Sequence, residues 1–322
     1  MVKVVVRWVE DGDIATGELD DLETARASGL AWVDVLGVEE GPLLDLGKRL
    51  DLHALAIEDC LHFPQRPKID EYATSWFVVW VTPMPEGERN IHMAELDAFL
   101  GSDFLVTVHA DPLAVIADTF TEGPAVFRGG AVGLLHQIID RLVDSVQPLV
   151  DDVADRLEDL EDTMMSTEVR RETQRSSLHD LYVLRRQLVA MHRTIGPERD
   201  VLRALVRVRE MVDDDIYRYL QDVGDHLARA EDSIETAREV AAAVMDIHLS
   251  VQNNRMNEIM KQLTAVATIF MPLTLISGIY GMNVVRGMRP PITATWSFAA
   301  VVGSMVVIAV GMAFYFRRKN WW

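Results

Sequence analysis

One helical face near the C-terminal end carries side chains that could conduct a cation. Its positions follow one another at spacings of 7, 4, 3, 4, 3, 4, 3 and 4 residues, and a coiled-coil core with this spacing would carry Leu, Ile and Val. Here the residues are polar, small or flexible, and rings of carboxylates and amides around a lumen are the chemistry of cation pathways. We interpret this polar stripe as pore-lining, although tight helix packing in lipid also favours small residues. The stripe comprises Asp246, Asn253, Asn257, Met260, Thr264, Ala267, Met271, Thr274 and Gly278, with Leu263 beside the lumen.

Two methionines of the polar stripe are candidates for narrow points. Met260 and Met271 could form hydrophobic constrictions, which gate a pore by excluding water. Ordinary packing is the alternative, because Met fills irregular space. No charged residue lies on the stripe between Met260 and Gly278, so an ion that crosses there has to keep its own water.

The polar stripe enters the first of two long uncharged segments. Residues 262–285 form a run of 24 without a charge, and residues 290–316 form a run of 27. A membrane span needs about 20 apolar residues, so the pattern predicts a transmembrane hairpin. Positive charge gathers on the cytoplasmic side of membrane proteins, which places both termini in the cytoplasm and the chain in the cell's inner membrane. The flanking charges are Lys261, Arg317, Arg318 and Lys319 on one side, and Arg286 and Arg289 in the connecting loop.

The rest of the chain is strongly acidic. The net charge is −19, and because residues 256–322 carry +5, residues 1–255 carry −24. Such a surface excludes nucleic acid as a partner and suits inorganic cations or basic proteins, with plain solubility as the alternative. Cys60 is the only cysteine, so no disulfide or cysteine-zinc framework exists. The nine histidines form no metal-ligand motif, and we interpret His226 and His248 as surface or packing residues.

The soluble part divides into an α/β half and a helical half. Four β-rich runs, VKVVVRWV, AWVDVLG, SWFVVWVTP and DFLVTVHA, predict strands, with short helices at 41–51 and 55–61. From about Gly129 an apolar period of three to four residues predicts one long helix and then a second over 169–193, which ends before Gly196-Pro197. A last helix runs from after Asp215 to Tyr280, 65 residues or roughly 100 Å. A helix of this length needs partners, so we expect an oligomer.

These patterns predict the following segments. We expect a cytosolic α/β domain at 1–125, an antiparallel helical hairpin with a connecting helix at 126–212, and a cytosolic stalk helix at 213–261. The first transmembrane helix covers 262–283, an external loop 284–295, the second transmembrane helix 296–316, and a basic cytosolic tail 317–322.

Two stretches resemble a known family. MNEIMKQLTAVATIFMPLTLISGIYGMNV, at 256–284, is similar to the signature of the CorA-type divalent-cation transporters, whose hallmark is a Gly-Met-Asn triplet at the outer end of the first membrane helix. Upstream, LAIEDCLHFPQRPKIDEY, at 55–72, resembles the family's ED…QRPK segment. The resemblance covers nearly the whole chain and is weakest over residues 1–50.

The resemblance implies an architecture and a mechanism. Members are homopentamers that move Mg²⁺, often with Co²⁺ or Ni²⁺, while a ZntB-type branch moves Zn²⁺. In the family a regulatory ion sits between neighbouring subunits, and the matching positions here are Asp59 and Asp222. Mg²⁺ would thus be both substrate and regulatory ligand. Cytosolic Mg²⁺ at these interfaces would hold the pore shut. No phosphate-binding loop is present, and we expect neither an organic cofactor nor enzymatic activity.

The triplet Gly281-Met282-Asn283 is the candidate selectivity filter that the resemblance implies. Mg²⁺ gives up its water reluctantly, and a ring of amide oxygens from Asn283, with backbone carbonyls near Gly281, could accept hydrogen bonds from the hydrated ion. The alternative is structural: Asn and Gly also end helices.

One departure from the family leaves the identity of the ion open. Members commonly carry an acidic Met-Pro-Glu-Leu segment after the triplet, whereas this loop has no acid and places Arg289 near the usual glutamate. Three readings therefore remain: a pentameric Mg²⁺ channel, a ZntB-like Zn²⁺ transporter, and a membrane-tethered sensor or scaffold without flux.

Overall fold

The computed structural model describes residues 2–87, 89–165, 171–208, 212–281, 295–319 and 321, with backbone alone at 171–175, 295 and 297. The chain divides into two compact units, Met1–Val244 and Met245–Trp322, and each is treated by itself. The helix α8 (Asp214–Gly281) contributes residues to both.

The first unit is built on a seven-stranded sheet in the order β2-β1-β3-β7-β6-β5-β4. β3 and β7 are parallel, and every other neighbouring pair is antiparallel. The four predicted strands are confirmed, and β2, β4 and β6 are additional. The bounds are β1 Lys3–Glu10, β2 Asp13–Gly17, β3 Ala31–Leu36, β4 Lys68–Glu71, β5 Trp76–Glu86, β6 Asn90–Leu100 and β7 Phe104–His109.

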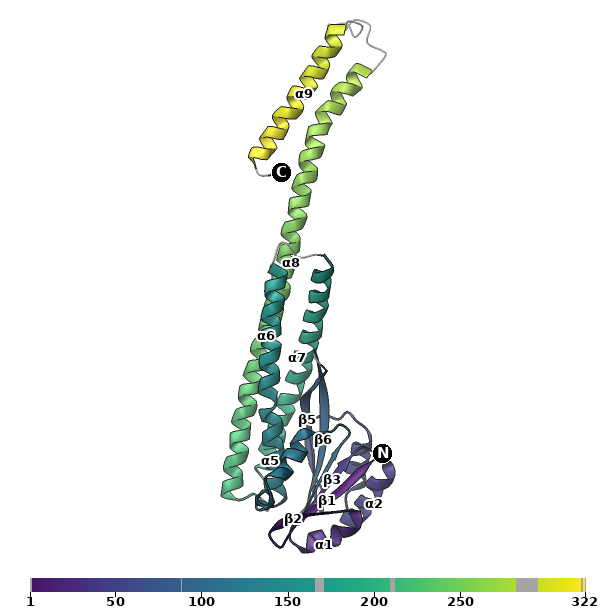
Figure 1. Cartoon of the computed structure of the whole chain (residues 1–322), viewed down its shortest axis with the longest axis vertical. Coiled ribbons are helices and arrows are strands. Elements are labelled where there is room, and N and C mark those ends of the chain that lie inside the picture. The colour runs from purple at the N-terminus through teal and green to yellow at the C-terminus, as the bar shows by residue number, and fades with distance from the viewer. Residues whose placement is uncertain are drawn as a thin grey trace. The chain divides into compact units, whose positions relative to one another are not determined.

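Helices cover both faces of this sheet (Figure 1). One face carries Val33, Val79 and Val106, which share a buried core with α1 (Leu22–Ala27), α2 (Glu40–Leu50) and α3 (Ala54–Leu61). The helices expected at 41–51 and 55–61 are thereby confirmed to within a residue or so. The opposite face contacts α5 (Gly130–Asp144), α6 (Val146–Met165) and α7 (Arg171–Leu205), and α4 (Ala114–Thr121) packs on α5. The central strands are buried on both sides, which explains their continuous apolar runs.

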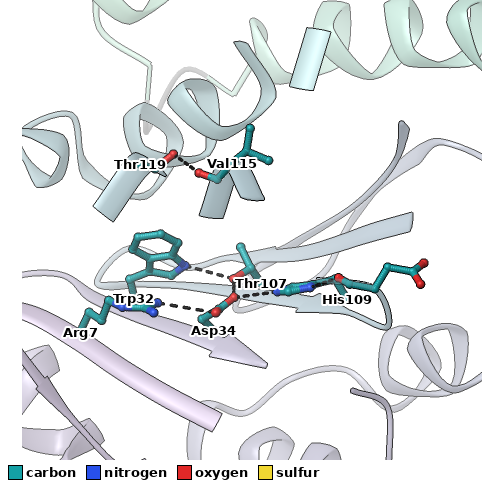
Figure 2. A network of polar contacts seen from close by, with 8 residues as sticks. Arg7, Trp32, Asp34, Thr107, His109, Val115 and Thr119 are labelled. Carbon is teal, nitrogen blue, oxygen red and sulfur yellow. Dashed lines mark hydrogen bonds and ion pairs between the residues drawn. The ribbon is translucent and has the colours of Figure 1, made fainter. Parts of the chain in front are cut away.

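A buried polar network ties β1, β3 and β7 together on the α4–α5 face, as Figure 2 shows. Thr107 Oγ1 donates to Asp34 Oδ1 at 2.7 Å and accepts from Trp32 Nε1 at 3.1 Å. His109 Nε2 lies 3.1 Å from Asp34 Oδ1, and Arg7 Nη1 lies 3.6 Å from Asp34 Oδ2. The Arg7 guanidinium also lies 5.0 Å from the centroid of the Trp32 ring. Asp34 is therefore a buried carboxylate with two cationic neighbours, which is how buried charge is tolerated.

The helical half differs from the expectation at two points. The first predicted helix is two, because α5 ends at Asp144 and α6 begins at Val146. Pro148 has no N–H to donate to the Asp144 carbonyl, which removes one hydrogen bond of the ladder and favours a break at this point. The second predicted helix does not stop before Gly196-Pro197: α7 continues through Pro197 to Leu205. Tertiary packing overrides the local breaker, as the burial of Ile195, Val201 and Leu202 shows.

The second unit contains the C-terminal part of α8 and the helix α9 (Thr295–Arg318). The helix predicted to run unbroken to Tyr280 is confirmed, since α8 reaches Gly281. Both α8 and α9 contain a stretch long and apolar enough to cross a membrane, with mean hydropathy 1.7 and 2.2. Large apolar side chains in this unit are exposed, among them Met271 at 74% and Phe298 at 71%. Such a surface fits contact with lipid or with further helices.

Candidate metal centres and cation path

The polar stripe lies on an exposed face of α8. All ten of its candidate residues, from Asp246 to Gly278 and including Leu263, are exposed. Within 265–276 the buried or half-buried positions are Ala265, Thr268, Ile269, Pro272, Leu273 and Ile276. At 100° per residue most of these lie on the side of α8 away from the stripe. The covered side of α8 is thus mainly apolar, while the stripe residues are exposed together with apolar side chains such as Phe270.

Two threonines of the stripe satisfy their hydroxyl groups within the helix. Thr264 Oγ1 donates to the Met260 carbonyl at 2.7 Å, and Thr274 Oγ1 donates to the Phe270 carbonyl at 2.9 Å. Each hydroxyl oxygen keeps its lone pairs for another donor. A hydrated cation presents water hydrogens, so these oxygens are suited to accept from its shell.

The candidate filter falls at the end of the described helix. Gly281 is the last residue of α8. Met282 and Asn283 lie outside the described residues, as do Arg286 and Arg289 of the loop. The amide ring expected at Asn283 therefore rests on the sequence alone and stays a prediction.

Asp59 lies near the end of α3 and is already paired. Its Oδ2 is 2.6 Å from Lys68 Nζ, and the same ammonium lies 3.0 Å from Asp70 Oδ2. Partial burial opposes the charge on Lys68, but hydrogen bonds to the two carboxylates outweigh it and raise the pKa of Lys68. A divalent cation at Asp59 would therefore have to compete with an internal ammonium ion.

Two buried acids lie close to Asp59. Glu95 Oε2 accepts a hydrogen bond from the Gln65 backbone N–H at 2.6 Å, and Asp97 is fully buried. Burial raises the pKa of Asp97 well above its usual range, and the neighbouring Glu95 raises it further. Burial also raises the pKa of Cys60, which keeps its thiol protonated and unreactive. Asp59 is half-buried, with 29% of its side chain exposed, and is the most accessible of these three acids.

Asp222 lies on α8 with His226 one turn further on. The Asp222 carboxylate is 68% exposed, and its Oδ2 is 3.6 Å from His226 Nε2. Within one chain the structure places Asp59 beside Lys68 and Asp222 beside His226, and it does not pair the two aspartates with each other. A site that uses both carboxylates requires a second copy of the chain.

A three-residue cluster beside Asp222 has the chemistry of a cation site. Asp140 and Asp144 on α5 and His226 on α8 bring their ligand atoms within 4.8 Å of one another. The shortest contact joins His226 Nδ1 and Asp144 Oδ1 at 2.8 Å. Burial raises the pKa of Asp140, and the nearby Asp144 charge raises it further, so a bound cation would relieve this repulsion. One imidazole with two carboxylates suits Zn²⁺ and similar divalent ions.

His226, interpreted from the sequence as a surface or packing residue, is half-buried and packs between two helices. The ring bridges α5 and α8 across 82 residues of sequence. The available signal was the repeated spacing of four residues, in Asp140 and Asp144 and again in Asp222 and His226, which puts each pair on one helix face. That spacing alone cannot show that the two faces meet.

Comparison with known proteins connects this geometry to a family. The model of the family described as CorA-like Mg²⁺ transporter protein matches residues 27–318. The cobalt/magnesium transport protein CorA of Thermotoga maritima is 32% identical over 299 residues, which are 90% of this chain and 83% of that protein. The structure of the CorA magnesium transporter from Methanocaldococcus jannaschii superposes with a TM-score of 0.83 at 27% identity, covering 99% of this chain and 98% of that one. The zinc transport protein ZntB of Yersinia enterocolitica is 27% identical over 58% of this chain.

Proposed function

The chain belongs to the family of CorA-like Mg²⁺ transporter proteins, and from that premise we propose that it conducts Mg²⁺ passively across the cell's inner membrane. Divalent-cation transport is the activity of the family, whose members are channel-like transporters and not enzymes. The choice of Mg²⁺, with Co²⁺ and Ni²⁺ as secondary substrates, is the proposal. The names of the relatives support it, since both Mg²⁺ and Co²⁺ occur in them.

The polar stripe on α8 is the observation that carries the proposal. Its residues are exposed and lie away from the mainly apolar, covered side of the same helix. Five copies arranged around one axis would surround a lumen with amides, hydroxyls and small residues, and would present no charge between Met260 and Gly278. Mg²⁺ would therefore pass with its water, and the Asn283 amides at the outer end would select the hydrated ion.

Transport needs no energy source other than the membrane potential. With both termini in the cytoplasm, an ion that moves inward runs down an inside-negative potential. At ~100 mV a doubly charged ion gains about 4.6 kcal/mol, from roughly 2.3 kcal/mol per charge. This driving force alone accumulates a divalent cation more than a thousandfold, at about 1.4 kcal/mol for each factor of ten.

The acidic interface would act as the gate. We assign the regulatory ion to Asp59 of one subunit and Asp222 of its neighbour, with Asp140, Asp144 and His226 as an adjacent cation site. Each soluble segment of residues 1–255 carries −24, so a pentamer concentrates about −120 around its axis. Bound Mg²⁺ offsets the repulsion and holds the subunits together, and its loss loosens the ring.

Zn²⁺ is the second candidate substrate. The imidazole of His226 beside two carboxylates suits Zn²⁺ better than Mg²⁺, which takes oxygen ligands. Relatives named as zinc transport proteins match a little over half of the chain. A Mg²⁺ channel should carry Mg²⁺ in preference to Zn²⁺, and a zinc transporter should show the reverse preference. A tethered sensor should carry neither ion.

Flux into liposomes tests these readings. Purified protein is reconstituted, an inside-negative potential is imposed, and uptake of Mg²⁺ and of Zn²⁺ is followed with fluorescent indicators inside the vesicles. We expect Mg²⁺ uptake that Asn283→Ala abolishes while leaving the oligomer intact. Asn254→Ala, an exposed asparagine of α8 that lies off the stripe, is the comparison and should retain uptake. Wild-type flux in Asn283→Ala would mean that the triplet only ends a helix, and absence of any flux would favour the tethered sensor.

A further inference from the structure

A groove between α7 and α8 runs beside the proposed gate but belongs to neither the gate nor the cation path. Its volume is about 720 Å³, within the range of roughly 300–1,000 Å³ that small-molecule sites occupy. Leu202 and Leu220, exposed by 3% and 1%, contribute apolar surface between the two helices. Gly224 lines the α8 wall, and a Cβ built there would meet nothing within 4 Å, so the space above it is open.

One wall of this groove carries three arginines. Arg199 and Arg203 share a face of α7 at four-residue spacing, and Arg207 follows in the turn after the helix ends at Leu205. Three guanidinium groups in one groove are unexpected in a segment with a net charge of −24. Such a group concentrates positive potential where the surrounding surface is negative.

Internal ion pairs leave most of this charge available. Arg199 pairs with Glu231, Nη1 to Oε2, at 2.5 Å. Among the residues that the structure describes, Arg203 pairs with Asp200 alone, at 3.3 Å, and both side chains are more than 60% exposed, so water screens the pair. Arg207 is exposed and makes no ion pair with any residue in the described part of the chain. Two guanidinium groups therefore face the groove with little or no compensation.

We propose that this groove binds a nucleoside polyphosphate as its Mg²⁺ complex. Guanidinium groups bind phosphate oxygens through paired, charge-assisted hydrogen bonds, and several of them match a chain of phosphates better than a single phosphate. Asp225 on the α8 wall would repel a bare polyanion, but it suits the cation that such an anion carries. The apolar surface beside the arginines leaves room for the remainder of the nucleoside.

The site would place phosphate-bound Mg²⁺ on the same turns of α8 as the sensor for free Mg²⁺. Gln221 and Gly224 line the groove, while Asp222 lies on another face of the helix, beside His226. The link between the nucleotide site and the Mg²⁺ sensor rests on the proposed gate, whereas the binding of Mg·ATP in the groove does not. Binding is measured on the purified protein in detergent, so a failure of transport and a failure of this site give separate results.

The experiment titrates Mg·ATP into the full-length protein by calorimetry, with inorganic phosphate in a parallel titration. We expect saturable Mg·ATP binding that Arg203→Gln with Arg207→Gln weakens by about tenfold or more, because each lost charge-assisted contact accounts for about that factor. Arg193→Gln, an exposed arginine on the same helix but outside the groove, is the matched control and should bind as the wild type does. Inorganic phosphate should bind far more weakly than Mg·ATP.

A second variant fills the groove without removing charge. Gly224→Met projects a side chain into the open space and raises helix propensity, so it should fold and block binding. If the double arginine variant unfolds, Gly224→Met still tests whether Mg·ATP binds in this groove. The proposal is overturned if the wild type shows no saturable binding, if Gly224→Met binds with wild-type affinity, or if inorganic phosphate binds as tightly as Mg·ATP.

Discussion

Glu198 is a carboxyl group buried between α7 and the sheet, with 4% of its surface exposed. It accepts a hydrogen bond from the Val81 backbone, at a point where β5 has no β4 partner because that pairing ends at Val79. Its Oε1 has no hydrogen-bond partner in the described part of the chain. Burial raises the pKa of Glu198 well above its usual range, so the group folds in its neutral form and serves the sheet edge as an acceptor.

Glu198→Gln should therefore stabilise the protein, and increasingly so as the pH rises. A carboxyl with a raised folded-state pKa imposes no penalty below its unfolded pKa of about 4.5, and the penalty grows by about 1.4 kcal/mol per pH unit up to the folded pKa. The amide keeps the acceptor for Val81 and cannot ionise. Thermal unfolding should give equal midpoints near pH 4.5 and a higher midpoint for the variant at pH 7.5. A variant less stable at pH 7.5 would contradict the neutral form.

His109 should make stability depend on pH in the opposite direction from Glu198, with its stabilising contribution lost as the pH rises. Its Nδ1 lies 2.6 Å from the Asp111 carbonyl and its Nε2 lies 3.1 Å from Asp34, so both ring nitrogens face acceptors. Burial opposes the imidazolium, but the Asp34 hydrogen bond and charge outweigh it and raise the pKa of His109. The pKa of Asp34 is lowered in turn: burial raises it, and His109, Thr107 and Arg7 more than offset that effect.

His109→Gln should thus cost more stability at pH 6 than at pH 8.5. The stabilisation by a raised histidine pKa is complete below the unfolded pKa of about 6.5 and is lost as the pH rises through the folded value. Removing one partner of a buried ion pair costs on the order of 3–5 kcal/mol. The measurement compares unfolding midpoints of variant and wild type at the two pH values. His92→Gln is the control, because that ring is exposed and pairs with Asp111 at the surface. A cost that does not change with pH would mean that His109 folds as the neutral imidazole.

The stalk helix α8 is the element that carries both sensor and pore residues. Asp222 lies near its N-terminal end and the polar stripe near its C-terminal end, and no break interrupts the 68 residues of the helix. A helix of this length is not stable by propensity alone, so its stability comes from neighbours along its length. Ion pairs with α7 supply some of it, including Arg199 with Glu231 and His192 with Glu235.

Removal of the two sensor carboxylates should weaken the effect of Mg²⁺ on α8. We expect millimolar Mg²⁺ to protect the wild-type stalk from limited proteolysis, and Asp59→Ala with Asp222→Ala to remove most of that protection. Asp151→Ala with Asp152→Ala, on the exposed acidic face of α6, removes the same charge and should keep it. Equal protection in all three proteins would place the sensor elsewhere, with the cluster of Asp140, Asp144 and His226 as the next candidate.

The second unit exposes large apolar side chains, which lipid or further helices can cover. The exposed stripe of small and polar residues beside them offers a face along which copies of α8 could meet around a lumen. In a fivefold arrangement with the stripe on the axis, the stripe would line a lumen and the apolar faces of α8 would contact lipid or neighbouring helices.

A mass measurement in mild detergent should therefore give a pentamer of the 36.2 kDa chain. Native mass spectrometry separates five copies from four or six. Mg²⁺ should stabilise this species against dissociation, since the proposed site bridges subunits. Monomers or dimers in the presence of Mg²⁺ would exclude the shared lumen and favour the tethered sensor.

The sequence by itself determined the strongly periodic elements and the family. The apolar strands β1, β3, β5 and β7, the unbroken α8 and the two uncharged segments depend on residues within one element, so their patterns are legible along the chain. The Gly-Met-Asn triplet and the ED…QRPK segment identify the family in the same local way. β2, β4 and β6 were missed because their residues do not keep an apolar run.

Only the tertiary structure decided which side chains meet. The pairing of Asp59 with Lys68, the cluster around His226, the buried Glu198 and the arginine groove each join separate elements. The continuation of α7 through Pro197 belongs here too, because packing on both sides of the proline outweighs a local preference of about 3 kcal/mol. Helix periodicity tells which residues share a face, but it does not tell which face packs against which. That choice is made by burial summed over the whole fold, and no single segment contains it.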